Sequence, residues 1–508
     1  MSPEPDRTLT HVIVVGAGFA GLSAACFLGR GGVRVTLVER HEQPGGRARV
    51  WAEGGFRFDM GPSWYWMPDL FERFFGSFGR QVPEFYDLQR LDPSYRIVWP
   101  EGSDDDARHW DVPAGVPALR SLFETVEPGA GAALDRFLVQ TRYIYESANA
   151  DYLLRPSLSV REFVDPRLLA ELVRMRMLRS MSAYARSFVT DERLARLLEW
   201  PVLFLGASAR KTSAMYSLMS YADMALGTWY PAGGMHRIIE GMMEVARGLG
   251  VEFRFGARVE RIQVESGGPG GARATGVVLE GGEALSGDAV LAAADYHHVE
   301  QELLPPEHRQ YSPRYWETRT LSPSSLLYYL GVRGELPSLP HHTLFFDRDL
   351  DAHMEAVYDR PAWPDDPLFY VCHPSASDPT VAPEGHANLF LLVSLAPGLQ
   401  DSDAALERTF HQVMDRLEVH VDRPLRGDLV VQRSYAMRDF VADYGALGGN
   451  AYGLANTLRQ TGPFKPRLRS AKVRGLYFAG QLTVPGPGMP PSLVSGELAA
   501  GVLLGERE

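Results

Sequence analysis

The chain has 508 residues, of which 45% are hydrophobic and 22% charged, a composition that excludes a disordered protein and predicts two or three globular domains. The net charge of −12 argues against nucleic acid as a partner, because the phosphate backbone would repel the protein. The only cysteines, Cys26 and Cys372, lie far apart in the sequence and indicate neither a disulfide scaffold nor a metal cluster, as expected for a reducing cytoplasm.

The first predicted unit is a β-α-β arrangement close to the N-terminus. Residues 12–15 are apolar and mostly β-branched, which predicts a buried parallel strand. Gly16, Gly18 and Gly21 then form a G-x-G-x-x-G turn into a helix, and residues 33–38 predict the second strand. Because all the parts of the pattern are in register, we expect a dinucleotide site here rather than a purely structural unit.

Each residue type in this unit has a physical role. Gly16 permits the tight turn, Gly18 lets the backbone approach a pyrophosphate, and Gly21 lets helix and strand pack closely. Free N–H groups and the dipole at the helix N-terminus attract the diphosphate. Glu39 ends the second strand, where a carboxylate accepts hydrogen bonds from ribose hydroxyls and repels the 2′-phosphate of NADP.

A second glycine pair follows, Gly45 and Gly46, with Arg47 and Arg49 directly behind it. Backbone donors and guanidinium groups suit the same phosphates. The simpler alternative for the two arginines is exposed loop charge. Plain NAD dehydrogenases do not need this addition, and the extended pattern resembles the FAD-binding signature of the amine oxidase and carotenoid desaturase superfamily.

An aromatic segment comes next. Phe56 and Phe58 alternate with polar neighbours as in a short strand, and Gly61-Pro62 ends it in a turn. Residues 64–67, Trp-Tyr-Trp-Met, are unusually aromatic for a loop. These rings either fill a seam between domains or line the mouth of an apolar substrate pocket.

Residues 115–225 show mainly helical patterns. Within 167–196, leucines and methionines recur every three or four residues between arginines, which describes a basic amphipathic helix. Such a helix lies either in the headgroup region of a bilayer or on an ordinary solvated surface. No stretch of 18 apolar residues exists, and prolines interrupt the uncharged residues 475–496, so any membrane association must be peripheral.

A glycine-led helix at 233–250 and strands at 251–255 and 259–264 return the chain to the nucleotide domain, and strands at 275–280 and 289–292 complete a small meander. Beyond residue 300, strand-like runs alternate with loops and one helix, which predicts a second α+β domain. These runs lie at 326–330, 388–395 and 428–431, and the helix near 402–418.

Two pairs of adjacent histidines occur, His297-His298 and His341-His342. Neighbouring residues of a regular helix or strand point in different directions, so neither pair is expected to chelate one ion from one face. We therefore predict no metal site.

At the end of the chain, residues 476–479 predict a short buried strand, followed by Gly480 and Gln481. A Pro-Gly-Pro-Gly-Met run then leads into a helix at about 491–504.

The chain resembles the phytoene desaturase family of bacterial carotenoid synthesis over nearly its full length. The resemblance rests on the opening glycine turn, Gly45-Gly-Arg47 and four further motifs that match in type and order. These are Phe58-Asp-Met-Gly-Pro-Ser63, Tyr230-Pro-Ala-Gly-Gly-Met-His-Arg237, Ala293-Ala-Asp-Tyr-His-His298 and the closing motif at 475–496.

The resemblance implies an α/β fold with a Rossmann-like FAD-binding domain of the glutathione-reductase type. That domain would be discontinuous, formed by 1–95, 230–300 and 470–508. A mostly helical lid at 96–229 would contact substrate and membrane, and a mixed-sheet α+β domain at 301–469 would bind substrate.

The same resemblance implies an FAD site near both ends of the chain. Relatives place an acid at or near Gln481, which can still form hydrogen bonds, and the backbone of Val259 would lie near the adenine. The last helix would point its N-terminus at the flavin pyrimidine edge and stabilise reduced flavin. The implied residues are Gly16, Gly18, Phe19, Ala20, Gly21, Glu39, Arg40, Gly46, Arg47, Gly61, Pro62, Ser63, Val259, Gly480, Gln481, Gly488 and Met489.

The implied activity is FAD-dependent desaturation of a carotenoid precursor such as phytoene, with hydride transfer to flavin N5 and no assigned catalytic acid or base. Quinone or oxygen would accept the electrons, and the protein would be cytoplasmic, bound peripherally to the inner membrane. A carotenoid isomerase, ketolase or terminal oxygenase shares the fold, whereas an amine oxidase would need an aromatic cage. A non-catalytic isoprenoid-lipid-binding protein would not need the intact phosphate glycines.

Overall fold

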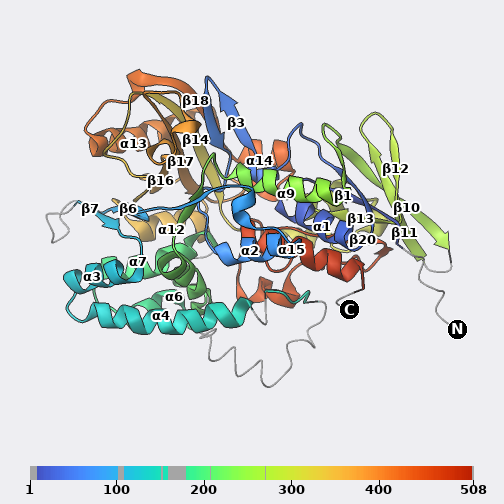
Figure 1. Cartoon of the computed structure of the whole chain (residues 1–508), viewed down its shortest axis with the longest axis horizontal. Helices are drawn as coiled ribbons and strands as arrows, with labels where there is room; N and C mark the ends of the chain where they lie inside the picture. The colour runs from blue at the N-terminus through green and yellow to red at the C-terminus, as the bar shows by residue number, and fades with distance from the viewer. Residues whose placement is uncertain are drawn as a thin grey trace.

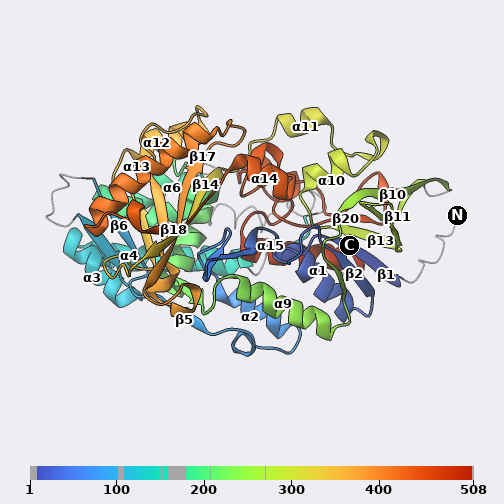
Figure 2. The ribbon, with the colours of Figure 1, turned by 90° about the horizontal axis from the view of Figure 1, so that it is seen from above.

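The computed structural model describes residues 9–100, 108–149, 153–157, 179–205, 208–268 and 271–505. Two sheets occupy opposite ends of the elongated molecule. A parallel sheet lies at the right of Figure 1 and a larger mixed sheet at the left, with helices packed around and between them (Figures 1 and 2).

The parallel sheet has five strands in the order β20-β13-β1-β2-β9, and all its neighbouring pairs run parallel. The central strand β1 is formed by the apolar run expected from the sequence, and its residues 12–15 are buried. Its strands are β1 (His11–Val15), β2 (Arg34–Val38), β9 (Glu252–Arg254), β13 (Ala289–Ala292) and β20 (Leu476–Phe478).

Three helices cover one face of this sheet: α1 (Phe19–Arg30), α9 (His236–Gly248) and α15 (Met489–Leu503). Helix α1 packs between the other two, so the last helix of the chain lies directly against the first. The Ser23 hydroxyl on α1 donates a hydrogen bond to the backbone carbonyl of Leu493 on α15 at 2.7 Å.

The contact between α1 and α15 depends on a glycine. A Cβ atom added to Gly496 would lie 2.1 Å from the carbonyl oxygen of Ala20, well inside van der Waals distance. The two helix backbones can therefore approach this closely only where α15 has no side chain.

A small meander covers the other face of the parallel sheet. It consists of β10 (Val259–Gly268), β11 (Gly271–Leu279) and β12 (Ala284–Ser286), with β19 (Val473–Arg474) paired parallel to β11. We expected residues 289–292 to complete this meander, but β13 leaves it and pairs with β1 in the parallel sheet. Its four residues are all buried, as a strand covered on both faces requires.

The larger sheet has seven strands in the order β18-β14-β17-β16-β15-β6-β7. Its pairs are antiparallel except for β15 with β6, so the sheet is mixed, as the resemblance implied. Its strands are β6 (Tyr95–Val98), β7 (His109–Val112), β14 (Ser324–Arg333), β15 (His342–Phe345), β16 (Phe369–Cys372), β17 (His386–Leu395) and β18 (Leu429–Tyr435).

Strands β6 and β7 differ from the expectation that residues 96–229 are mostly helical. Tyr95 and Ile97 on β6 and Trp110 and Val112 on β7 are buried in the period-2 pattern of a strand, and Val98 at the end of β6 is buried on the other face. The first part of this segment therefore extends the sheet, and the helices follow it.

Strand β14 is buried on both faces. Leu326 and Tyr328 pack on α13 (Asp403–Val421), whereas Leu327 and Tyr329 face the interior between the sheet and the rest of the molecule. The interior face of this strand thus supplies side chains to the centre of the protein.

The helices below the large sheet in Figure 1 are α3 (Val116–Val126), α4 (Ala130–Ser147), α6 (Met181–Ala185) and α7 (Glu192–Glu199). The remaining named elements are β3 (Val50–Glu53), β4 (Phe56–Asp59), β5 (Leu88–Arg90), β8 (Trp229–Pro231), α2 (Pro68–Gly76), α8 (Leu218–Tyr221), α10 (Tyr296–Glu302), α11 (Pro313–Glu317), α12 (Leu350–Tyr358) and α14 (Met437–Tyr444).

Of the predicted basic amphipathic helix at 167–196, residues 167–178 lie outside the described residues, and 179–196 contain α6 and the start of α7 instead of one continuous helix. Two arginines from its end form ion pairs in the structure: Arg186 with Glu192 and Glu199, and Arg196 with Asp351. Within the described ranges, no helix is both long enough and apolar enough to span a bilayer.

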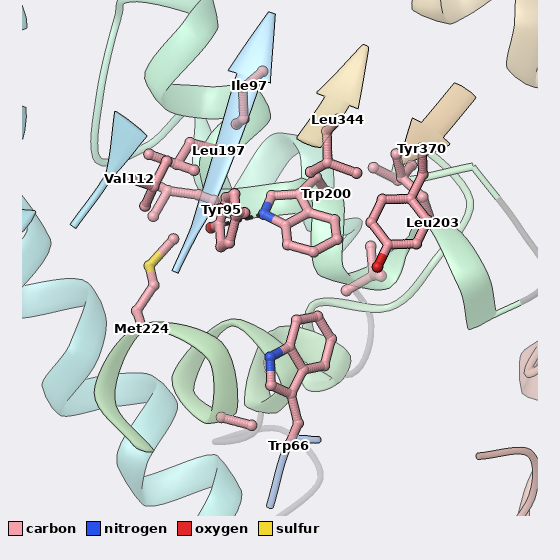
Figure 3. Packing of buried hydrophobic residues seen from close by; sticks show 14 of the residues in the cluster. Trp66, Tyr95, Ile97, Val112, Leu197, Trp200, Leu203, Met224, Leu344 and Tyr370 are labelled. Carbon is pink, nitrogen blue, oxygen red and sulfur yellow. Dashed lines mark hydrogen bonds between the residues drawn. The ribbon is translucent and has the colours of Figure 1, made fainter. Parts of the chain in front are cut away.

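The aromatic run at 64–67 fills the seam between the two halves. Trp66 packs on Trp200, whose indole nitrogen donates to the Tyr95 hydroxyl at 3.0 Å (Figure 3). Tyr65 points the other way and contacts Phe71 on α2. Successive side chains of this run therefore join two different hydrophobic clusters.

The packing of α15 on α1 gives a direct test. We expect Gly496→Ala to lower the free energy of unfolding by about 3 kcal/mol, because its methyl group would force two helix backbones apart. Gly248→Ala is the matched control, since a Cβ there meets no atom within 4 Å at the end of α9. Urea unfolding followed by circular dichroism measures both, and equal midpoints would contradict the close packing.

Candidate functional site

One large cleft opens at the carboxyl ends of the parallel strands and extends to the seven-stranded sheet. Val15, Val38, Ala293 and Ala479, at or just beyond the ends of β1, β2, β13 and β20, all line it. Ligands of open α/β sheets bind at this edge. All of the cofactor-site residues expected from the sequence line this cleft except Gly21 and Ser63.

The first turn has the conformation that its glycines predicted. Gly16 has a φ of +101°, and its N–H donates to the Val38 carbonyl at 2.8 Å. A Cβ on Gly21 would lie 1.9 Å from the Gly16 carbonyl oxygen. Gly21 therefore lies behind the turn and permits close packing, without facing the cleft.

Gly18 and Gly46 lie close together and both line the cleft. A Cβ on Gly18 would have no neighbour closer than 4.0 Å, and one on Gly46 would lie 3.4 Å from the Gly18 Cα. Gly46 also has a φ of +55°, which favours glycine. Two bare backbones at the N-terminus of α1 leave space and N–H donors for a diphosphate.

Glu39 is buried, with 5% of its surface exposed, and is held by two backbone hydrogen bonds. One carboxylate oxygen accepts from the N–H of Ala17 at 2.8 Å, and the other from the N–H of His41 at 3.0 Å. Each oxygen keeps acceptor capacity, and the side chain lines the cleft, as a partner for ribose hydroxyls requires.

Arg47 lines the cleft with an incomplete set of hydrogen bonds. Its Nη2 donates to the Asn450 carbonyl at 3.3 Å, and its Nε is buried with no partner among the described residues. The guanidinium lies 4.7 Å from the centre of the Tyr444 ring. With the amide of Gln481 turned to satisfy both its ends, the Gln481 oxygen accepts from Arg47 Nη2 at 3.0 Å.

Asp295 is an acidic residue of the cleft whose charge interacts with that of Arg47. It caps α10 by accepting from the His298 N–H, and its other oxygen has no partner among the described residues. Burial raises the pKa of Asp295 to about 6, although Arg47 and the backbone N–H groups oppose this shift. Burial likewise lowers the pKa of Arg47. Bare glycines and unsatisfied buried polar atoms together fit a large polar cofactor such as FAD.

Two expectations from the sequence are corrected by the structure. Arg49, which we expected near the phosphates, forms an ion pair with Asp443 and a hydrogen bond to the Tyr444 hydroxyl instead. Ser63 lies outside the cleft, where its hydroxyl accepts a hydrogen bond from Tyr370 at 3.0 Å. Both side chains tie the FAD-binding domain to the second domain.

Sequence reasoning missed the residues that close the cleft from the second domain. Ser325 and Leu327 on β14, Leu392 on β17 and Phe440 on α14 all line it. Leu327 and Leu392 fall within the strand-like runs expected at 326–330 and 388–395, but nothing in the sequence indicated that these runs face a dinucleotide loop some 300 residues or more away. None of them is charged, so the cleft becomes apolar toward the large sheet.

Comparison with known proteins identifies the family. The model of the flavin containing amine oxidoreductase family matches residues 19–504. This chain belongs to that family.

Two relatives match this chain over almost its whole length. A carotenoid 3,4-desaturase from Haloarcula japonica is 42% identical and covers 98% of this chain and 99% of its own. A zeta-carotene-forming phytoene desaturase from Myxococcus xanthus is 33% identical, covering 97% and 94%. An oxidoreductase structure from Methanosarcina mazei aligns with a TM-score of 0.64 at 16% identity over 96% of this chain and 99% of its own, which shows the shared fold.

These findings confirm the FAD-dependent oxidoreductase expected from the motifs. The chain has the amine-oxidase-type α/β fold, uses FAD, and is an oxidoreductase acting on CH–CH groups.

Gly18→Ala should separate cofactor binding from folding. The φ of −79° is open to any residue, and the new methyl group would clash with nothing in the protein. It would project into the diphosphate space, so we expect a folded protein that purifies without flavin absorbance. Gly21→Ala is the contrasting variant and should fail to fold because of its 1.9 Å contact. A yellow Gly18→Ala protein would contradict this placement of the diphosphate.

Glu39→Ala should weaken FAD binding about 10- to 100-fold, because charged hydrogen bonds contribute about 1.5–3 kcal/mol. Titration of the apoprotein with FAD, followed by fluorescence, measures the effect. Glu53→Ala removes the same charge from an exposed site on β3 and is the control. Glu39→Gln retains one acceptor oxygen, so its FAD affinity should lie between those of Glu39→Ala and Glu53→Ala. Unchanged affinity in Glu39→Ala would reject the ribose role.

Proposed function

We propose that this chain is a carotenoid desaturase that removes two hydrogens from adjacent carbons of a polyene. The proposal rests on one continuous cleft. This cleft joins the dinucleotide loop around Gly18 to an apolar wall formed by Leu327 and Leu392 of the large sheet. A flavin held at that loop would face a hydrophobic substrate and no charged group from β14 or β17.

The side chains at this wall have two tasks. Leu327, Leu392, Met60 and Phe440 are buried and line the cleft, so they exclude water and offer a surface that packs along an apolar chain. Alignment of the reacting carbons in such a site contributes about 7–11 kcal/mol to lowering the barrier. FAD, when bound, supplies the two-electron acceptor.

No catalytic base is required by this proposal. Positive charge that develops next to a polyene is delocalised along its double bonds, which lowers the demand for a strong proton acceptor. Two buried acids line the cleft, Glu39 and Asp295. Glu39 is held by backbone N–H groups, and Asp295 lies against Arg47 and caps α10, which assigns both to positioning.

The substrate is proposed from the relatives. The 42% identity to a carotenoid 3,4-desaturase supports desaturation at the 3,4 position of a carotenoid, and the 33% identity to a phytoene desaturase supports phytoene as the alternative. An amine substrate is disfavoured because guanidinium groups of Arg47 and Arg49 already lie over the Tyr444 ring, at 4.7 and 5.3 Å.

We further propose that the enzyme works at the cytoplasmic face of the inner membrane, bound peripherally, with quinone or oxygen as the final acceptor. A forty-carbon polyene is almost insoluble in water, so it must be drawn from a bilayer. The net charge of −12 requires that any contact with anionic lipid be local.

The test is turnover by the purified FAD-bound enzyme in liposomes. We expect new absorption at longer wavelength from a carotenoid with a saturated 3,4 bond, under anaerobic conditions with quinone as well as in air. Parallel reactions with phytoene decide between the two substrates. Gly18→Ala, folded but lacking FAD, is the matched control and should give no product.

Three results would contradict the proposal. Incorporation of labelled oxygen into the product would indicate an oxygenase. A product of unchanged hydrogen content would indicate an isomerase. Substrate binding without turnover by FAD-loaded enzyme would indicate a lipid-binding protein.

A further inference from the structure

A cluster of three possible metal ligands lies outside the FAD cleft, at one edge of the seam. His341, His342 and Cys372 are exposed by 4%, 0% and 2%, and one ligand atom from each lies within 4.8 Å of the other two. Cys372 forms no disulfide. The cluster takes no part in the proposed desaturation.

The fold explains how two neighbouring histidines converge. His342 begins β15 and is the register partner of Cys372, which ends the antiparallel strand β16. His341 precedes the strand, so side-chain alternation does not turn it to the opposite face. The two imidazole rings lie 4.5 Å apart. Our expectation that this pair could not share an ion assumed a regular strand through both residues.

One ring nitrogen of His342 has a hydrogen-bond partner and the other has none. The Tyr370 hydroxyl lies 2.7 Å from His342 Nδ1 and 3.0 Å from Ser63 Oγ. The Nε2 atom of His342 is buried without a hydrogen-bond partner among the described residues, so it is the nitrogen that is open to a metal ion.

His341 repeats this arrangement. Its Nδ1 contacts Ser377 Oγ, and that hydroxyl donates to the carbonyl of Pro374 at 3.4 Å. The Nε2 atom of His341 is also buried with no partner within the described part of the chain. A hydrogen bond at one ring nitrogen that leaves the other free is the usual support of a metal-bound histidine.

We propose that His341, His342 and Cys372 bind one Zn²⁺ ion. Two imidazoles and a thiolate suit this cation and exclude magnesium and calcium, which prefer oxygen ligands. Tetrahedral bonds of about 2.0 Å to nitrogen and about 2.3 Å to sulfur place the donor atoms about 3.3–3.5 Å apart. Ligand atoms that lie up to 4.8 Å apart therefore need to approach by at most about 1.5 Å, which side-chain rotations achieve.

The fourth position has room beside the thiol. A cavity of about 10 Å³ borders Cys372, Tyr230 and Asp59, enough for about one water molecule. The hydroxyl of Tyr230 is buried there without a partner among the described residues, and its ring lies 4.6 Å from that of His341. A zinc-bound water could donate to it.

The bound ion would brace the seam between the domains. Trp64 of the FAD-binding side stacks on the His342 ring at 4.0 Å, and Ser63 reaches the same ring through Tyr370. The ion would thus fix strands β15 and β16 of the large sheet against the loop that follows Gly61-Pro62 in the FAD cleft.

The test uses untagged, FAD-loaded protein, incubated with Zn²⁺ and freed of excess metal over a weak chelating resin. We expect about one zinc per chain by mass spectrometry. Cys372→Ser and His342→Gln should lower zinc content at least about fivefold, whereas flavin content should remain. Removal of zinc by a strong chelator should lower the melting temperature of the wild type and leave that of Cys372→Ser unchanged.

Cys26→Ser is the matched control, because Cys26 is also buried and free but lies in α1. It should retain zinc. Should Cys372→Ser not fold, zinc X-ray absorption of the wild type decides, with one sulfur expected at about 2.3 Å and nitrogen neighbours at about 2.0 Å. Wild type without stoichiometric zinc, copper in its place, or a zinc shell lacking sulfur would each overturn the assignment.

Discussion

The close approach of backbones around the first turn of α1 is the constraint on which the cofactor cleft depends. A Cβ on Gly21 would meet the Gly16 carbonyl, and one on Gly496 would meet that of Ala20. Helix α1 is thereby held between the β1 turn and α15, with the N–H groups of its first turn directed into the cleft. Total stabilities of about 5–15 kcal/mol leave little tolerance for a clash at either contact.

Polar contacts with the second domain also constrain the position of the phosphate loop. Arg49 pairs with Asp443, whose backbone carbonyl also contacts His41 Nε2 at 3.1 Å, and the Tyr444 hydroxyl donates to the Gly46 carbonyl at 3.3 Å. Such partly buried pairs add little net stability because desolvation offsets their attraction. Their effect is to hold α14 at one distance from the phosphate loop.

Local pattern was enough to predict the FAD-binding half. The run 12–15, the spacing from Gly16 to Gly21 and the acid at Glu39 each act within a single β-α-β unit, so their geometry follows from neighbouring residues. The strands at 326–330 and 388–395 were also recognisable from their apolar and aromatic content, although their order in the sheet was not.

The rest could not be predicted because it depends on contacts between distant segments. Nothing near Ser63 signals that Tyr370 withdraws it from the cleft, and nothing near Arg49 signals Asp443. Tyr95 and Ile97 lie in a strand that is held between β15 and β7, and β15 is some 250 residues away in the sequence. The convergence of His341 on His342 follows from where one strand begins, a boundary that sequence patterns locate poorly.

The strand order β20-β13-β1-β2-β9 also governs how the protein matures during synthesis. Strand β1 leaves the ribosome some 280 residues before its neighbour β13 and some 460 residues before the outer strand β20. One side of β1, with the glycine turn that follows it, therefore stays uncovered until β13 has been synthesised. Pairing across so long a separation is slow and exposes intermediates to aggregation, which makes chaperone assistance and early flavin supply a determinant of yield.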